Sequence, residues 1–363
     1  MNQDRTARIR QICRNFKITG EITEVIPWGN GLINDTFRVN TDAGEDYLLQ
    51  RVNEQVYPDL DGMMGNILRV TEFINRQTFY LPDGQAKQSL HVIPTVDGKP
   101  YFRDAAGSCF RIYNFMQNTY CMEVAEDPEK IGQAGVILGQ FHYLLRDFPV
   151  SELAIIIPDF HHPIMHYEKL LLATLMDRAG HLSSVEPEID FFTRYSDLYE
   201  ILSQAHEDGR LPLRVNHNDA KINNIMFDAA SGEPLCMVDL DTVMPGLLPY
   251  DFGDAIRSCM CTGRDGLCRE HMPEHMLDMA SYEAYRKGFL AGCQGILTPA
   301  EEADLPAGAL LIAAENGMRY LTDYLNGNIY FKVKYPEQNL VKARMHMRLA
   351  EDLLDCVCRN YRK

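Results

Sequence analysis

The sequence predicts an α+β fold with two lobes, a small β-rich lobe followed by a larger, mainly helical one. Runs rich in β-branched and aromatic residues alternate with turn residues up to about residue 115, and helical spacing dominates from about residue 129. The sequence shows no internal repeat and no low-complexity linker. We therefore expect one lobe at residues 1–114 and the other at residues 115–363.

The first lobe is expected to combine helices with short strands. Helices are predicted near residues 5–17 and 58–75, the second because apolar residues recur at helical spacing from Met63 to Ile74. Strands are predicted at residues 22–26, 36–39, 47–52, 91–93 and 110–113. The stretch 113–116 is expected to form the bend between the lobes.

Composition narrows the class of protein. The chain has 363 residues with 46% hydrophobic content, enough for one large or two moderate cores. Its formal net charge of −16 argues against nucleic acid or an anionic membrane surface as a partner, because both favour basic patches. We expect no signal peptide and no bilayer-spanning segment, since no apolar run is long enough. Ten scattered cysteines predict reduced thiols and a cytoplasmic location.

One group of side chains has the chemistry of zinc ligands: Cys259, Cys261, Cys268, His271 and His275. The Cys-x-Cys spacing is tighter than zinc sites usually show, and the glycines at 263 and 266 suggest a surface loop. A zinc site is therefore the less favoured interpretation.

The most informative segment surrounds Asp219. Two short apolar runs, 225–227 and 235–238, flank turn-forming residues and predict a β-hairpin. A hairpin brings its outer ends together, so Asn224 and Asp239 should lie side by side as hard-oxygen ligands for Mg²⁺ carried by phosphates. Asp219, five positions before Asn224, is then placed to accept the proton of an attacking hydroxyl. Asp and Asn are also common in loops for structural reasons, but the hairpin ending in apolar-Asp makes a chance match improbable.

Residues 214–228 and 238–241 resemble the Brenner motif of the aminoglycoside phosphotransferase and choline kinase group, a branch of the protein-kinase-like fold. A closer resemblance, over nearly the whole chain, is to bacterial N-acetylhexosamine 1-kinases. It is carried by residues 29–37, 57–59, 214–228, 238–246, 251–254, 317–321 and 327–331. The resemblance implies ATP-dependent phosphorylation of N-acetylglucosamine or N-acetylgalactosamine at the anomeric hydroxyl, with Mg²⁺.

The resemblance also implies roles for individual residues of the second lobe. Asp219 would be the catalytic base and would bind substrate, and Asn224 and Asp239 would bind the metal. Supporting roles fall to His217, Asp241 and Asp251. Lys221 and Asn223 could reach phosphate or sugar from the same loop.

Nucleotide binding is expected in the first lobe. Gly29, Asn30 and Gly31 would cover the phosphates, although Asn-Gly is also a common hairpin turn. The resemblance adds Asn34 and Thr36 as braces of this loop, and it places adenine against Asn114 to Met116, which are equally compatible with a core strand.

A kinase also needs a cation on the third strand, and the sequence has no lysine there. Either Arg51 takes this role, or Gln50 does so without charge, and Glu72 is a candidate for the partner acid on the next helix. This departure motivates an alternative, a catalytically silent nucleotide-binding protein.

For the acceptor, the resemblance implies that Arg319 and Tyr330 grip the sugar. The plain alternative is a surface ion pair of Arg319 with Asp323, one turn away on a predicted helix. His161 and His162 precede a helix and could line the substrate pocket, although a capping or surface role is the simpler interpretation. Kinases of the same fold acting on homoserine, methylthioribose, choline or an aminoglycoside remain alternatives, and the epimer, the nucleotide and the oligomeric state stay open.

Overall fold

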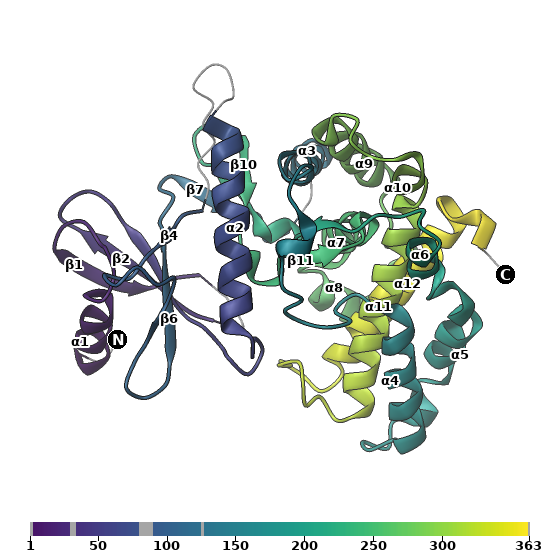
Figure 1. The fold of residues 1–363 in the computed structure, drawn as a ribbon. Coiled ribbons are helices and arrows are strands. Elements are labelled where there is room, and N and C mark those ends of the chain that lie inside the picture. Colours follow the sequence, from purple (N-terminus) through teal and green to yellow (C-terminus); the bar gives the residue numbers. More distant parts are fainter. Residues whose placement is uncertain (1–2, 30–33, 80–89, 125–126, 362–363) are drawn as a thin grey trace. The chain divides into compact units, whose positions relative to one another are not determined.

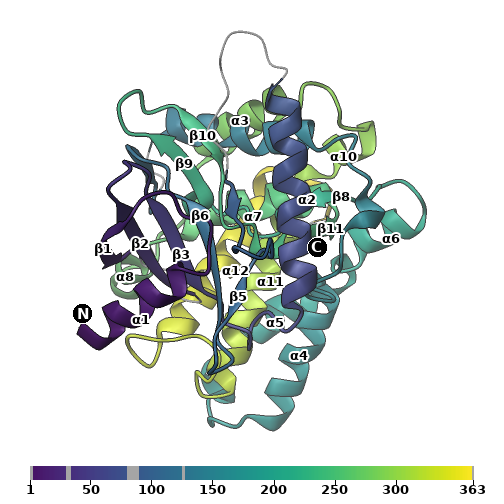
Figure 2. The ribbon, with the colours of Figure 1, turned by 60° about the vertical axis from the view of Figure 1, so that its left-hand side comes forward.

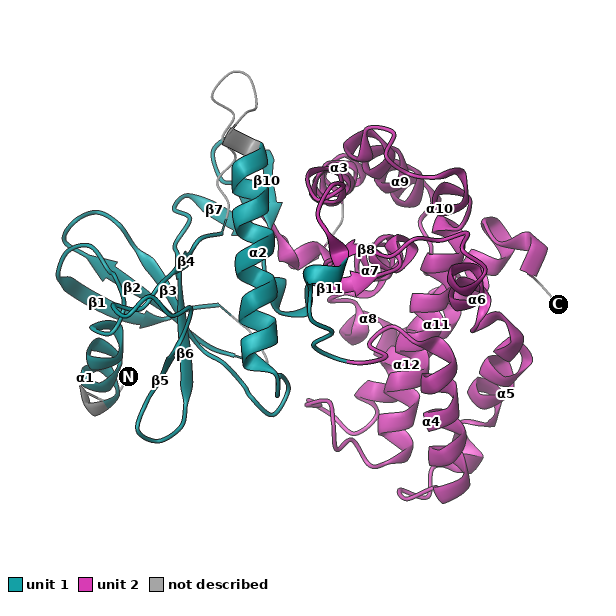
Figure 3. Cartoon of the chain, viewed as in Figure 1, with its two compact units in different colours: residues 1–120, 151–157, 227–243 teal, residues 121–150, 158–226, 244–363 magenta. Residues whose placement is uncertain are grey.

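The computed structural model describes residues 3–29, 34–79, 90–124 and 127–361. It forms two compact units, coloured separately in Figure 3. The first contains residues 1–120, 151–157 and 227–243, and the second contains the remainder. The small antiparallel sheet of the first unit and the helices of the second confirm the predicted α+β class.

The first unit is built on a six-stranded antiparallel sheet. Its strands are β1 (Ile22–Pro27), β2 (Asp35–Thr41), β3 (Tyr47–Arg51), β4 (Val92–Ile93), β5 (Phe102–Arg103) and β6 (Cys109–Asn114). They follow the order β1-β2-β3-β6-β4, and β5 pairs with β6 (Figures 1 and 2). The predicted strands are thereby confirmed, and the sequence interpretation missed only the two-residue β5 among them.

Helices contribute to the first unit's core in two places. The apolar side chains of α1 (Gln3–Cys13) pack against alternate residues of β2, β3 and β6, among them Val39, Leu49 and Ile112. The intervening residues of β3 and β6 face away from this cluster, because side chains alternate along a strand. The second helix, α2 (Leu60–Phe79), buries Met64 completely.

The predicted hairpin is confirmed. Strands β9 (Ile225–Asp228) and β10 (Pro234–Met237) are neighbours in a three-stranded sheet of order β10-β9-β7, with β7 at Thr119–Cys121. The carboxylate of Asp228 organises the turn by accepting hydrogen bonds from the N–H groups of Ala230 and Ser231.

The second unit is mainly helical. Its helices are α3 (Pro128–Leu144), α4 (Pro163–Met176), α5 (Glu186–Arg194), α6 (Ile201–Glu207), α7 (Leu248–Cys261), α8 (Asp265–Glu270), α9 (Met279–Cys293), α10 (Pro299–Ala303), α11 (Leu305–Leu325) and α12 (Gln338–Cys356). A two-stranded sheet, β8 (Arg214–Asn216) with β11 (Met244–Gly246), lies among them. The surface loop suggested at residues 263–266 is wrong in part, because α8 begins at Asp265.

Helix α11 contacts α7, α4 and α12. Its approach to α7 is so close that a side chain at Gly308 would collide with the backbone oxygen of Pro249, and one at Gly253 would collide with that of Gly308. Two glycines therefore set the spacing of the helices that carry Asp251 and Glu315. None of the helices within the described ranges is long and apolar enough to cross a membrane.

Candidate active site

The catalytic loop, residues 217–224, follows β8 and is held by hydrogen bonds to Asp251 of α7. This buried carboxylate accepts hydrogen bonds from the N–H groups of His217 and Asn218, both at 2.7 Å, and His142 Nε2 lies 3.2 Å from it. Burial raises the pKa of Asp251, but His142 and the N–H donors outweigh it and lower the pKa. Asn218 adopts a left-handed conformation (φ 61°), which Asn tolerates better than most residues. The loop thus turns sharply and presents the next residue, Asp219.

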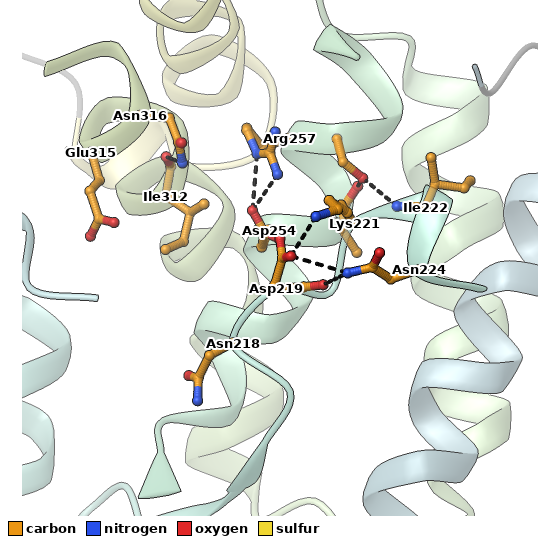
Figure 4. Close-up of polar contacts among 12 residues, drawn as sticks. Asn218, Asp219, Lys221, Ile222, Asn224, Asp254, Arg257, Ile312, Glu315 and Asn316 are labelled. Atoms are coloured by element: carbon orange, nitrogen blue, oxygen red, sulfur yellow. Dashed lines mark hydrogen bonds and ion pairs between the residues drawn. The ribbon is translucent and has the colours of Figure 1, made fainter. Parts of the chain in front are cut away.

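The Asp219 side chain is 28% exposed and makes two side-chain contacts (Figure 4). Lys221 Nζ lies 2.5 Å from Asp219 Oδ2, and the amide nitrogen of Asn224 lies 3.1 Å from the same oxygen. Burial raises the pKa of Asp219, but the charge of Lys221 outweighs this effect and lowers it. The carboxylate is therefore held ionised and oriented, as a group that accepts a proton late in the reaction requires.

Asn224 closes this loop, at the end of the 3₁₀ turn Ile222–Asn224. Its amide nitrogen also donates to the backbone oxygen of Asp219 at 2.8 Å, and the N–H of Ile222 donates to Ser258 Oγ on α7. The side-chain nitrogen is thus committed, which leaves the Asn224 carbonyl oxygen as the group that can bind a cation.

A second acid lies near Asp219 on helix α7. Asp254 Oδ1 accepts hydrogen bonds from Arg257 at 3.0 and 2.5 Å, and Figure 4 shows this pair beside Asp219 and Lys221. Asp254 Oδ2 is buried without a hydrogen-bond partner among the described residues. Asp254 is the seventh residue of α7 and lies beyond its first turn, so Arg257 rather than the helix dipole stabilises its charge.

His161 joins the catalytic loop to α11. Its Nε2 lies 3.0 Å from the backbone oxygen of Asn218, and its Nδ1 lies 3.2 Å from Glu315 Oε1. The capping or surface role considered for His161 is therefore wrong, because the side chain is only 6% exposed. Burial alone would lower the pKa of His161, but the Glu315 carboxylate raises it above its ordinary value. For Glu315, burial raises the pKa, and His161 outweighs this and lowers it. We conclude that the two form an ion pair.

Helix α11 also carries Arg319, one turn after Glu315. Asp323 is committed elsewhere, because its carboxylate accepts from the N–H groups of Tyr330 and Phe331. These bonds hold the loop that carries Tyr330 against α11, and the Phe331 ring centre lies 5.9 Å from the Arg319 guanidinium. The Tyr330 residue is 71% exposed. Arg319 and an accessible Tyr330 are thereby placed on neighbouring segments.

The residues predicted to bind nucleotide lie in the first unit. Gly29 has a positive φ of 71°, whereas Asn30 and Gly31 fall outside the described residues. Asn34 accepts from the N–H of Asn53 at 3.0 Å and donates to Asp241 Oδ2 at 3.0 Å. Asn34 therefore ties the end of the β1–β2 connection to the segment that follows β10.

Neither candidate for the third-strand cation is a buried positive charge, and a buried arginine on β6 contacts one of them. Arg51 is 54% exposed and lies 3.6 Å from Asp35. Gln50 donates to the Thr36 hydroxyl at 3.3 Å and accepts two hydrogen bonds from Arg111 of β6, at 2.9 and 2.7 Å. Arg111 is a fully buried cation that sequence reasoning overlooked.

The stretch predicted to meet adenine uses some of its backbone groups internally. The N–H of Asn114 donates to His91, that of Phe115 donates to Asp46, and the oxygen of Met116 accepts from the Thr119 hydroxyl. Among the described residues, the N–H of Met116 has no hydrogen-bond partner.

Asp239 and Asp241 follow β10 and differ in environment. Asp239 is exposed and has a left-handed backbone (φ 62°), whereas Asp241 is 2% exposed and paired with Arg111 at 2.6 Å. Backbone strain of this kind is often found at functional sites. Asp239 belongs to the first unit and Asn224 to the second, so the shared metal ion stays a prediction.

The donor atoms predicted to bind a metal have the chemistry of a magnesium site. An amide oxygen from Asn224 and a carboxylate from Asp239 are hard-oxygen ligands that suit Mg²⁺ when phosphates and water complete the shell. Within the described ranges, no three His, Cys, Asp or Glu side chains are grouped to hold a metal by themselves. Cys259 and Cys261 are buried, and burial raises the pKa of each thiol to about 12.

The residues that sequence reasoning missed share one signal. Arg111 interrupts the apolar strand Cys109–Asn114, and Glu315 interrupts the apolar run of α11. A charged residue in an apolar segment is seldom buried without a partner. The sequence therefore signalled that these residues were paired, but it did not identify the partners.

Comparison with known proteins places this arrangement in a family. Residues 24–287, well over half of the chain, match the model of the phosphotransferase enzyme family, APH. The chain therefore belongs to that family, whose members are phosphotransferases.

Solved structures show the same fold. An aminoglycoside phosphotransferase from Alicyclobacillus acidocaldarius aligns over 99% of this chain and 97% of its own, with 14% identity and a TM-score of 0.63. A microcompartment-associated aminopropanol kinase aligns over 96% and 97%, with 16% identity and a TM-score of 0.64. An amicoumacin kinase, solved with AMP-PNP and Ca²⁺, aligns over 97% and 94%, with 14% identity and a TM-score of 0.60. The chain therefore has the fold of a small-molecule kinase.

Proposed function

We propose that this phosphotransferase uses ATP and Mg²⁺ to phosphorylate the anomeric hydroxyl of an N-acetylhexosamine. The observation that carries the proposal is a chain of contacts from the proposed base to helix α11. Its members are Asp219, His161, Glu315 and Arg319. His161 contacts Asn218, the residue before the base, and Glu315, one turn before Arg319. An acceptor held by Arg319 would thereby be positioned relative to Asp219, the proposed base.

The charges near the base favour a neutral acceptor. Glu315 is paired with His161, and Asp254 is paired with Arg257, so neither acid is an uncompensated anion. Arg319 adds a further donor, and Tyr330 offers an accessible aromatic face. Hydroxyl and acetamido groups need such a mixture of donors and acceptors, whereas an ammonium group favours unpaired acids.

In the proposed mechanism, Asp219 would orient the anomeric hydroxyl and receive its proton as the sugar oxygen bonds to the γ-phosphorus. The bond from that phosphorus to the β,γ-bridging oxygen breaks, and ADP leaves. Lys221, released from Asp219 when phosphate arrives, would balance the charge of the transferred group. Asn224 and Asp239 would hold Mg²⁺, which neutralises the phosphate oxygens. The N–H of Met116 would bind the adenine edge, and the segment from Gly29 to Asn34 would cover the phosphates.

A second candidate is a kinase with a cationic acceptor. One observation favours it, since Asp254 Oδ2 and Glu315 Oε2 are buried without a hydrogen-bond partner among the described residues. Two of the structural neighbours, named for an aminoglycoside and for aminopropanol, are consistent with it.

The experiment that separates these candidates is a phosphate-transfer assay over N-acetylglucosamine, N-acetylgalactosamine, choline, homoserine, methylthioribose and an aminoglycoside. Phosphorus NMR of each product would report which hydroxyl was modified. We expect a hexosamine 1-phosphate. Transfer to choline or an aminoglycoside without transfer to hexosamines would overturn the proposal, and transfer to none would favour a silent nucleotide-binding protein.

A further inference from the structure

Gln50 of β3 and Arg111 of β6 form a pair created by sheet register. The two residues are direct partners across the antiparallel strands, and both face away from the cluster around α1. A kinase carries a lysine on the third strand, and Gln50 and Arg51 are the two residues predicted to stand in its place. The carboxamide oxygen of Gln50 accepts two hydrogen bonds from the Arg111 guanidinium, so the buried cation lies on the adjacent strand, β6.

The acid paired with Arg111 is also not the one that was predicted, which was Glu72 on the helix after the third strand. Glu72 is exposed on α2, and the α2 side chain that contacts Arg111 is Met64, with 3.9 Å between Nη1 and the sulfur. Arg111 Nη2 instead lies 2.6 Å from Asp241 Oδ1, and the two side chains are 1% and 2% exposed. The negative partner therefore follows β10, two residues after Asp239.

Asp241 connects Arg111 with the predicted nucleotide-binding segment, through Asn34, and lies two residues after the predicted metal ligand Asp239. Its second carboxylate oxygen accepts from Asn34, which in turn holds Asn53. Burial lowers the pKa of Arg111, but Asp241 outweighs it, with smaller effects of Tyr113 and Asp239 in the same direction, and the pKa is raised. One buried cation therefore balances two carboxylates, of which only Asp239 is exposed.

We propose that Arg111, held by Gln50, replaces the third-strand lysine as a positioning residue that restrains Asp241 and orients Asp239 toward a nucleotide-bound divalent cation. Asp241 is held by Arg111 and Asn34 and is buried, whereas Asp239 is exposed. This inference rests on the assignment of Asp239 to the metal and is independent of the acceptor's identity.

The test measures Mn²⁺ affinity, by electron paramagnetic resonance or calorimetry, for the full chain in the presence of AMP-PNP. Arg111→Met is expected to weaken Mn²⁺ binding at least tenfold. Arg103→Met, which removes an exposed arginine from neighbouring β5, is the matched control and is expected to leave Mn²⁺ affinity unchanged. Thermal unfolding of each variant reports whether it is folded.

Two double variants separate positioning from plain stability. Arg111→Met with Asp241→Asn removes both charges, so thermal stability should recover while Mn²⁺ affinity stays at least tenfold reduced. Arg111→Met with Gln50→Lys places a cation on the third strand, opposite residue 111. This double variant should restore Mn²⁺ affinity to within about threefold. Recovery of Mn²⁺ binding by the charge-free pair, or parental binding by Arg111→Met, would overturn the inference.

The variant Asp239→Asn distinguishes a wrong role for Arg111 from a wrong assignment of the metal in the proposed function. Parental Mn²⁺ affinity in that variant would show that Asp239 is not a metal ligand, which refutes the metal assignment itself. Weakened binding in Asp239→Asn together with parental binding in Arg111→Met would refute only the role of Arg111.

Discussion

The side-chain amide of Asn224 donates to both the backbone oxygen and the carboxylate of Asp219, at 2.8 and 3.1 Å. Asn224 therefore holds the carboxylate that we propose as the proton acceptor and, because its nitrogen is committed, has its oxygen left for the predicted cation. Lys221 contacts the same carboxylate oxygen, so side chains of the loop itself hold Asp219 in place.

Replacement of Asp219 by Asn should lower kcat by about 10²–10⁴-fold, because the amide cannot accept the proton. ATP affinity, measured by calorimetry, should change little, since Asp219 is assigned to the acceptor. Asp190→Asn, an exposed site on α5, is the control. Unchanged turnover in Asp219→Asn would contradict its assignment as the base.

Arg319→Ala should raise the KM for the hexosamine by about 10–100-fold, the loss expected for hydrogen bonds to a charged donor. Tyr330→Phe should have a smaller effect of a few fold, because the aromatic face remains. The KM for ATP should stay constant in both variants. The control is Arg359→Ala, which removes an exposed arginine. Equal rises in both KM values would indicate a general defect and argue against sugar contacts.

Glu315→Gln should lower the pKa of His161, because burial is then no longer opposed by a carboxylate. NMR titration of the histidine ring protons measures this shift directly, with exposed Glu186→Gln as the control. An unshifted His161 would mean that the ion pair does not form.

The same pair makes a pH-dependent contribution to stability. The raised pKa of His161 gives stability that is complete below its ordinary value of 6.5 and is lost as pH rises through the folded value. The lowered pKa of Glu315 gives stability that is present above its ordinary value of 4.5 and is lost as pH falls through the folded value. The unfolding free energy lost in Glu315→Gln, about 2 kcal/mol, should therefore be largest between these two ordinary values and shrink as the pH rises through the folded pKa of His161.

Gly308→Ala should destabilise the second unit by about 1–3 kcal/mol, because the added methyl group meets the backbone of α7. Gly266→Ala is a matched control, since a Cβ there meets nothing within 4 Å, and alanine favours a helix. Thermal unfolding compares the two. A Tm of Gly308→Ala equal to that of the parent would show that the helices can separate at little cost.

The sequence predicted the local features of the fold well, for reasons that are visible in particular elements. The hairpin at 225–237 was predictable because turn-forming residues lie between two apolar runs. Helix α2 was predictable from its apolar spacing, although its end at Phe79 extends past the predicted residue 75. The short strands β5, β7, β8 and β11 were missed because two or three residues carry no readable period.

By itself the sequence determined which side chains belong to the catalytic loop, because Asp219, Lys221 and Asn224 are close along the chain and meet through one turn. Only the tertiary structure decided the partners of Arg111 and His161. Arg111 meets Gln50 through strand register and meets Asp241, which lies 130 residues away in sequence, while His161, just before α4, meets Glu315 of α11. Such pairs are set by packing, since a buried charge is stable only where the fold supplies its opposite.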